Sequence, residues 1–235
     1  MNDILQRIRT DLAGAADEAA KESFQRFFKE QARFYGVKTG AVNKIARDSW
    51  REVKALDRAA IFALCEDLYR SDYTEEAFIA AEWLSRMSPR FEPGDLPLLE
   101  RWIDQYINNW AKCDGLCNHA VGDLVDRYPE SVVTLKRWAK AENRWLRRAA
   151  AVTLILPARR GRFLADVFDI CDLLLVDRDD MVQKGYGWLL KEAGRLHQTE
   201  VFDYVVKNKK VMPRTALRYA IELMPPELKQ EAMKR

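Results

Sequence analysis

The sequence contains few residues that interrupt helices, with only 10 glycines and 8 prolines in 235 residues. Most of them lie between regular segments, and the alternating pattern of a half-buried strand is almost absent. No apolar run reaches the roughly 18 residues that a membrane helix requires. The N-terminal segment also lacks the apolar core of a signal peptide. We therefore expect a helical, cytoplasmic protein that does not enter a membrane.

Cysteine and histidine are also scarce, with four and two residues respectively. Four cysteines in a chain of this length do not indicate a disulfide framework, so reduced thiols are expected. Cys113 and Cys117 lie four residues apart with His119 nearby, a spacing that raises the question of a metal site. A structural zinc ion takes four ligands, and no second cluster follows. We interpret the two cysteines as small buried helix residues and expect no metal.

Charge is nearly balanced overall, with 39 basic and 36 acidic residues giving a net charge of +3. The distribution along the chain is uneven. Acidic residues gather between Glu66 and Glu100, whereas Glu142 is the single acid in the basic stretch from Lys136 to Arg162. A balanced total with one strongly basic stretch predicts a local anion-binding face rather than a generally cationic protein.

Apolar residues recur at spacings of three and four along most of the chain, which predicts helices. The expected helices span residues 2–13, 17–34, 39–54, 57–71, 75–88, 95–108, 110–127, 130–140, 143–155, 160–175, 179–194, 198–208, 213–223 and 226–234. Thr39 is the expected N-cap of the third helix. The side chains expected in the core include Trp83, Trp102, Trp138 and Trp145.

Several expected helices share a pattern of small residues in the middle flanked by large ones. They are Phe78–Leu84, Trp145–Val152, Val182–Leu190 and Arg214–Ala220. Small residues allow neighbouring helices to approach closely, as a stacked array requires. A period in the high thirties with two helices per unit is typical of HEAT and armadillo repeats, which bury their apolar faces only by stacking. We expect an all-α, right-handed α-solenoid of such repeats, forming a single domain over residues 1–235 with a concave basic groove.

The stretch from Asn108 to Gly122 contains the main candidate site residues. Trp110 and Asp114 lie four residues apart, so an indole and a carboxylate share one helix face. Arg148 follows Trp110 by 38 residues and Trp188 follows Arg148 by 40 residues, so stacked repeats would bring all four side chains to one groove. Taken alone, Trp110 fits a core residue and Asp114 fits a helix cap or an ion-pair partner.

These segments resemble a known family. Gly36-Val-Lys, Trp110-Ala-Lys-Cys-Asp114, Trp145-Leu-Arg-Arg148-Ala-Ala and Gln183-Lys-Gly-Tyr-Gly-Trp188 are similar to the AlkD-type DNA alkylation repair glycosylases, in order and over nearly the whole chain. The resemblance implies a HEAT-like-repeat enzyme that excises N3- and N7-alkylated purines from double-stranded DNA without a metal or other cofactor. It further implies that Trp110 and Trp188 contact the damaged nucleotide, Asp114 performs the chemistry and Arg148 holds the DNA backbone.

The chemistry suits these residue types. An N3- or N7-alkylated purine is cationic and leaves as a neutral base, so no general acid is needed. An ionised aspartate near the sugar stabilises oxocarbenium charge and places a water molecule, and indoles attract a cationic base. Further DNA contacts are expected from basic side chains on the same helices, because guanidinium and ammonium groups bind phosphate. They are Arg144, Lys184, Lys112, Lys44 and Arg218.

Two residues depart from the best-known member of that family. Phe27 stands where that member has a tyrosine, and Lys112 lies within an Ala-Lys-Cys segment that differs from its counterpart. Two other functions fit the same scaffold: a non-catalytic protein that binds DNA structures, and a peptide-binding HEAT scaffold. Tight binding to branched DNA without base release would mark the first, and an acidic or neutral concave face would mark the second. The expected state is a monomer.

Overall fold

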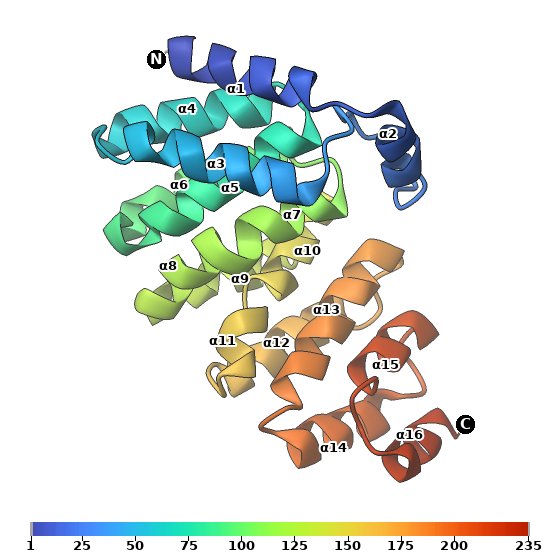
Figure 1. Ribbon diagram of the computed structural model, residues 1–235. Helices are drawn as coiled ribbons and strands as arrows, with labels where there is room; N and C mark the ends of the chain where they lie inside the picture. The colour runs from blue at the N-terminus through green and yellow to red at the C-terminus, as the bar shows by residue number, and fades with distance from the viewer. Residues whose placement is uncertain (1, 235) are drawn as a thin grey trace. The chain divides into compact units, whose positions relative to one another are not determined.

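The computed structural model describes residues 2–234 and is built from helices joined by short turns (Figure 1). Within these residues, strand-like pairing is limited to an isolated parallel bridge between Arg33 and Tyr73. The all-α prediction is confirmed. None of the described helices is long and apolar enough to cross a membrane. The chain folds as two compact units, one ending at Ala120 and the other beginning at Val121. A single domain over residues 1–235 stays a prediction.

The first unit arranges its longer helices in two layers. Its helices are α1 (Asn2–Gly14), α2 (Glu18–Gln25), α3 (Thr39–Val53), α4 (Arg58–Arg70), α5 (Thr74–Met87), α6 (Leu96–Tyr106) and α7 (Trp110–Leu116), with short 3₁₀ turns η1 (Ser88–Arg90) and η2 (Pro93–Asp95). Helix α5 packs against α3 and α7, and α4 packs against α5 and α6. The layer formed by α3, α5 and α7 carries the site residues predicted for this unit.

The second unit repeats this arrangement. Its helices are α8 (Gly122–Arg127), α9 (Val132–Trp138), α10 (Arg144–Val152), α11 (Ile155–Arg159), α12 (Leu164–Leu174), α13 (Asp180–Ala193), α14 (Gln198–Asn208), α15 (Arg214–Ala220) and α16 (Pro226–Met233), with a 3₁₀ turn η4 (Pro129–Ser131). Helix α13 packs between α10 and α15 and also contacts α12. A π-helical turn, Cys117–Val121, connects α7 to α8 along the chain.

Helix starts show the repeat directly. In the first unit, α3, α5 and α7 begin at residues 39, 74 and 110, so successive starts are 35 and 36 residues apart. In the second unit, α10, α13 and α15 begin at residues 144, 180 and 214, which are 36 and 34 residues apart. The repeat expected from sequence is therefore present within each unit, with a period slightly shorter than the predicted one.

The core is aliphatic and tryptophan-rich, as expected. Trp83, Trp102 and Trp138 are fully buried, and Trp145 retains 7% of its surface. The indole of Trp83 donates a hydrogen bond to the Ala46 carbonyl, at 3.1 Å, and thereby ties α5 to α3. Because these side chains fill the space between helices, they are unavailable for ligands.

The predicted helix over residues 17–34 is wrong beyond Gln25. Residues 26–38 form an irregular segment, although the spacing of their aromatic residues follows a helical period. The Gln25 side chain donates to the Glu30 carbonyl at 2.8 Å and accepts from the Ala32 amide at 3.2 Å, so it replaces helical hydrogen bonds. Phe24 and Phe28 each contact Phe34 ring to ring. The periodic aromatics thus form a local cluster instead of one helix face.

Smaller differences concern helix ends. Lys38, not Thr39, occupies the N-cap position of α3, and its side chain makes no capping hydrogen bond. The expected helix over residues 160–175 begins only at Leu164, because Phe163 adopts a left-handed conformation with φ of 62°. The expected helix over residues 110–127 is continuous but passes through the π-helical turn.

Candidate nucleic-acid interface and active site

The candidate site residues lie on one layer of helices in each unit. In the first unit, Lys44 is on α3 and Trp110, Lys112 and Asp114 are on α7. In the second unit, Arg144 and Arg148 are on α10, Lys184 and Trp188 on α13, and Arg218 on α15. The repeat predicted from sequence therefore places each group on neighbouring helices of its own unit. A single groove that joins the two groups stays a prediction.

Trp110 is the first residue of helix α7, and Asp114 lies one turn further along the same helix. Asn109 caps the helix, since its side-chain oxygen accepts a hydrogen bond from the Lys112 amide at 3.0 Å. Trp110 and Asp114 are both partly exposed, whereas Ala111, the Lys112 side chain and Cys113 between them are buried. The exposed side of α7 therefore presents an indole and a carboxylate one helical turn apart, and neither is sealed in the core.

The indole of Trp110 is held by the irregular segment that follows α2. The Phe28 ring stacks on it with centroids 5.2 Å apart and planes inclined by 14°. The indole nitrogen also donates to the Phe27 carbonyl at 3.4 Å. An apolar pocket of about 140 Å³ lies beside the stack, lined mainly by aromatic residues and by residues of α3. The Phe27 side chain itself is 71% exposed.

A buried carboxylate fixes the far end of this segment. Glu75, on α5, is 2% exposed and accepts hydrogen bonds from the backbone amides of Tyr35, Gly36 and Val37 at 2.9–3.1 Å. Gly36 has a φ of +91°, and a Cβ there would lie 2.3 Å from the Asp17 carbonyl oxygen, so only glycine fits. The segment that supports Trp110 is therefore anchored to the same layer as α7.

Lys112 is buried, although a contact with DNA phosphates was predicted for it. Its side chain is 1% exposed, and its ammonium group contacts the Asp72 carboxylate at 2.6 Å, the Asp72 carbonyl at 2.8 Å and the Asn108 side chain at 3.0 Å. Burial lowers the pKa of this lysine, and the Asp72 carboxylate opposes that shift. Because the ammonium is enclosed by these oxygens, Lys112 holds the start of α7 to the α4–α5 turn and offers no surface to a phosphate.

Lys44 is placed differently. Its side chain is 73% exposed on α3 and forms an ion pair with Asp48 at 2.7 Å, one turn further along the same helix. Exposed pairs of this kind contribute little to stability and exchange readily. Lys44 is thus accessible to a polyanion.

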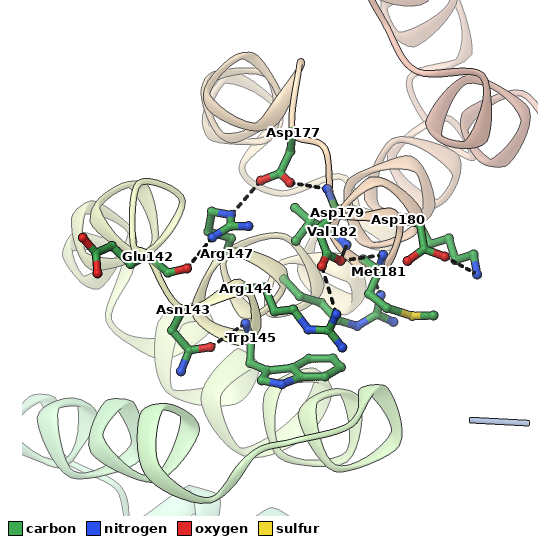
Figure 2. A network of polar contacts seen from close by, with 12 residues as sticks. Glu142, Asn143, Arg144, Trp145, Arg147, Asp177, Asp179, Asp180, Met181 and Val182 are labelled. Atoms are coloured by element: carbon green, nitrogen blue, oxygen red, sulfur yellow. Dashed lines mark hydrogen bonds and ion pairs between the residues drawn. The ribbon is translucent and has the colours of Figure 1, made fainter. Parts of the chain in front are cut away.

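In the second unit, Arg144 and its neighbours form a network at the start of α10 (Figure 2). The Arg144 guanidinium bonds to Asp179, the N-cap of α13, at 3.0 Å and lies over the Trp145 ring at 4.5 Å from its centroid. Arg147 pairs with Asp177 at 2.7 Å. These contacts connect α10 to the segment that enters α13. About a third of the Arg144 side chain remains exposed.

The Arg148 side chain is more deeply buried than expected for a residue that only contacts a DNA phosphate. It is 5% exposed, and its guanidinium donates to the Met181 carbonyl in the first turn of α13. A Cβ at Gly185 would lie 3.4 Å from the Arg148 side chain, so the glycine leaves room for it between α10 and α13. The geometry assigns Arg148 a structural contact, and its predicted contact with the DNA backbone stays a prediction.

Trp188 and the remaining basic residues are accessible. Trp188 and Lys184 are partly exposed one turn apart on α13, and Lys184 lies 3.5 Å from Asp180. Arg218 is exposed on α15. Close packing positions these two helices, because a Cβ at Gly187 would lie 2.7 Å from both the Ala216 carbonyl oxygen and the Tyr219 Cβ. Trp188 therefore directly follows a glycine at which α13 and α15 pack closely.

The cysteines near Asp114 do not form a ligand set. Cys113 and Cys117 are fully buried, whereas His119 is exposed. Across residues 2–234, no group of three or more His, Cys, Asp or Glu side chains is arranged to hold a metal ion.

Sequence reasoning missed three residues that support α7. Phe28 and Glu75 hold the segment beside Trp110, and Asp72 encloses Lys112. All three act across long sequence separations, for which a single sequence carries no signal.

Comparisons with known proteins identify the family and the fold of the chain. The family model described as DNA alkylation repair enzyme matches residues 8–224. No curated protein sequence matches significantly. The structure of a predicted DNA alkylation repair enzyme from Enterococcus faecalis is similar, with a TM-score of 0.80 and 16% identity over 90% of this chain and 97% of that one.

Two structures from Streptococcus mutans are also similar. AlkD2 has a TM-score of 0.60 and 21% identity, covering 76% of this chain and 87% of its own. The protein smu.31 has a TM-score of 0.57 and 21% identity, covering 81% and 96%. At such identities these neighbours establish the shared fold. Because the family model spans nearly the whole chain, this protein belongs to the DNA alkylation repair enzyme family.

Proposed function

We propose that the protein is a DNA glycosylase that hydrolyses the N-glycosidic bond of cationic N3- and N7-alkylated purines in double-stranded DNA. The observation that carries this proposal is the pairing of Trp110 and Asp114, both partly exposed and one turn apart on α7, in a chain of the DNA alkylation repair enzyme family. An indole attracts a cationic base, and a carboxylate stabilises the positive charge that develops on the sugar.

Asp114 carries the chemical step. As the C1′–N bond breaks, the purine takes the bonding electrons and leaves as a neutral base, while positive charge develops on the sugar. The carboxylate stabilises that charge and orients a water molecule. The water oxygen bonds to C1′, and its proton passes to the carboxylate or to solvent. No group is needed to protonate the leaving base, consistent with a chain that has only two histidines.

The tryptophans select the charged base. Trp110 and Trp188 offer indole faces, and a cation over an indole gains roughly 0.5–2 kcal/mol relative to a neutral group. The preference falls on alkylated purines because ordinary purines lack the charge. Lys44, Arg144, Lys184 and Arg218 contact backbone phosphates, which orients the duplex without reading its sequence.

Base release is the test. Wild-type protein is incubated with duplex DNA treated with a methylating agent, and free bases are separated by chromatography. The proposal predicts 7-methylguanine or 3-methyladenine in the supernatant above the spontaneous rate, and no release of normal bases. If no base is released while the protein binds branched or gapped DNA tightly, the non-catalytic DNA-structure binder replaces the glycosylase.

A further inference from the structure

A basic groove lies at the end of the second unit, formed by the turn that follows α14, the first residue of α15 and the residue that follows α16. It encloses about 540 Å³ and is lined by Lys209, Lys210, Met212, Pro213, Arg214 and Lys234. Four of these six residues are cationic, and no described lining residue is acidic. In a chain with a net charge of only +3, this concentration is local.

Interactions within the groove leave most of this charge uncompensated. The Glu231 carboxylate pairs with Lys234 at 3.1 Å and also interacts electrostatically with Lys209, so it is shared between two of the four cations. Lys209 donates to the backbone carbonyl of Glu231, a neutral group, at 3.1 Å. Lys210 and Arg214 are exposed. The groove therefore carries a positive potential at its open side.

The groove continues the layer that carries Trp188. Arg214 is the first residue of α15, and Arg218 lies one turn further on the same helix. Helix α15 packs closely on α13, which carries Lys184 and Trp188. Within the second unit, basic side chains thus extend from α13 across α15 to the groove.

We propose that this groove binds backbone phosphates of the DNA duplex at a distance from the damaged nucleotide. The inference rests on the proposed function for the identity of the polyanion. A single bound anion would need buried donors that enclose it, whereas this groove is open and its cationic groups are mostly exposed. Open rows of exposed lysine and arginine are suited to a polymer with repeated phosphates, whose binding releases counterions.

The double variant Lys210→Gln/Arg214→Gln tests the proposal, because both side chains are exposed. Arg86→Gln/Arg90→Gln is the matched control, since it removes the same charge from two exposed residues, at the end of α5 and in η1, that do not line the groove. Equilibrium binding is measured with undamaged duplexes of increasing length at several salt concentrations. Single-turnover base release is measured on a duplex with one 7-methylguanine, with the protein in saturating excess over the DNA.

On long duplexes the groove variant is expected to bind on the order of tenfold more weakly, with a salt slope smaller by about 0.9 for each phosphate that it no longer neutralises. On the shortest duplexes that still bind, and in base release at saturation, it should match wild type. The control should match wild type throughout. An unchanged affinity and slope at every length overturns the proposal, as does an equal loss at every length.

A different partner gives a distinct result. If DNA affinity is unchanged but binding to a polyglutamate peptide is abolished, the groove receives an acidic protein, and the proposal is wrong. Failure of the proposed function is also separable. If wild type releases no base but the groove variant shows the predicted length-dependent loss of affinity, the groove proposal stands and the glycosylase proposal fails.

Discussion

Phe28 stacks on Trp110, with ring centroids 5.2 Å apart and the ring planes inclined by only 14°. One face of the indole is thus covered by a residue from the irregular segment after α2. Together with the hydrogen bond from the indole nitrogen to the Phe27 carbonyl, the stack fixes the orientation of Trp110. Under the proposed function, the indole is ordered before DNA arrives, so less side-chain entropy is lost on binding.

Phe28→Ala is expected to reduce kcat/KM for base release about three- to tenfold, because an aromatic pair contributes roughly 0.5–1.5 kcal/mol beyond its buried area. The measurement is base release from a duplex with one 7-methylguanine. Phe27→Ala is the control, since the backbone carbonyl of Phe27, not its ring, bonds to the indole nitrogen. Equal activity of Phe28→Ala and wild type would show that the stack does not order the site.

Lys112→Met is expected to destabilise the first unit by about 1–3 kcal/mol, because oxygens of Asp72 and Asn108 lose their donor. Lys44→Met, which removes an exposed lysine, should change stability by no more than about 0.5 kcal/mol. Urea denaturation followed by circular dichroism measures both. A Lys112→Met protein as stable as Lys44→Met would contradict the assignment of Lys112 to a structural role.

Gly187→Ala is expected to destabilise the second unit by about 1–3 kcal/mol, because the added methyl overlaps the backbone of α15. Gly115→Ala is a matched change in α7, where the nearest atom, the Ala81 Cβ, would be 3.6 Å away. That change should be neutral or stabilising by up to about 1 kcal/mol. The melting temperatures of both variants are compared with that of wild type. A Gly187→Ala protein with the wild-type melting temperature would refute the close packing of α13 on α15.

Glu66 makes the stability of the first unit depend on pH. Its carboxylate accepts hydrogen bonds from Arg101 at 2.7 and 3.0 Å and from Tyr106 at 2.9 Å. The Arg101 guanidinium is the main cause that lowers the pKa of Glu66 from 4.5 to about 2. Because the folded pKa lies below the ordinary value, the stabilisation is present above pH 4.5 and is lost as the pH falls towards 2.

Glu66→Gln should therefore lower the free energy of unfolding on the order of 2 kcal/mol at neutral pH. The difference from wild type should shrink as the pH falls from 4.5 towards 2. Glu82→Gln, which breaks an exposed pair with Arg86, should show little difference at any pH. Denaturant titrations across this pH range test the expectation, and a constant difference would exclude Glu66 as the titrating group.

Much of the fold follows from local signals in the sequence. Helical periodicity and sparse glycine and proline predicted nearly every helix of the two repeat layers, and the similar spacing of small residues predicted stacking. The main exception is the segment over residues 26–38, where aromatic periodicity is helical but ring packing and the Gln25 side chain favour an irregular path.

The candidate site was less predictable. Spacing correctly indicated that Trp110 and Asp114 share an accessible helix face, because that relationship is local. It gave Lys112 the wrong environment, since the burial of an ammonium depends on Asp72, 40 residues earlier. It also gave no indication that Arg148 fills the space beside Gly185, which depends on how closely two helices pack.

The most direct test of the central claim is the single-turnover rate of base release by wild type and Asp114→Asn on a duplex with one 7-methylguanine, with the affinity of each protein for that duplex measured in parallel. The substitution keeps the shape of the side chain and removes its charge. The proposed mechanism predicts a loss of at least about 100-fold in rate, since one charge-stabilising group contributes roughly 2.7–4 kcal/mol, with affinity changed little. An Asp114→Asn protein that releases the base at the wild-type rate would contradict it.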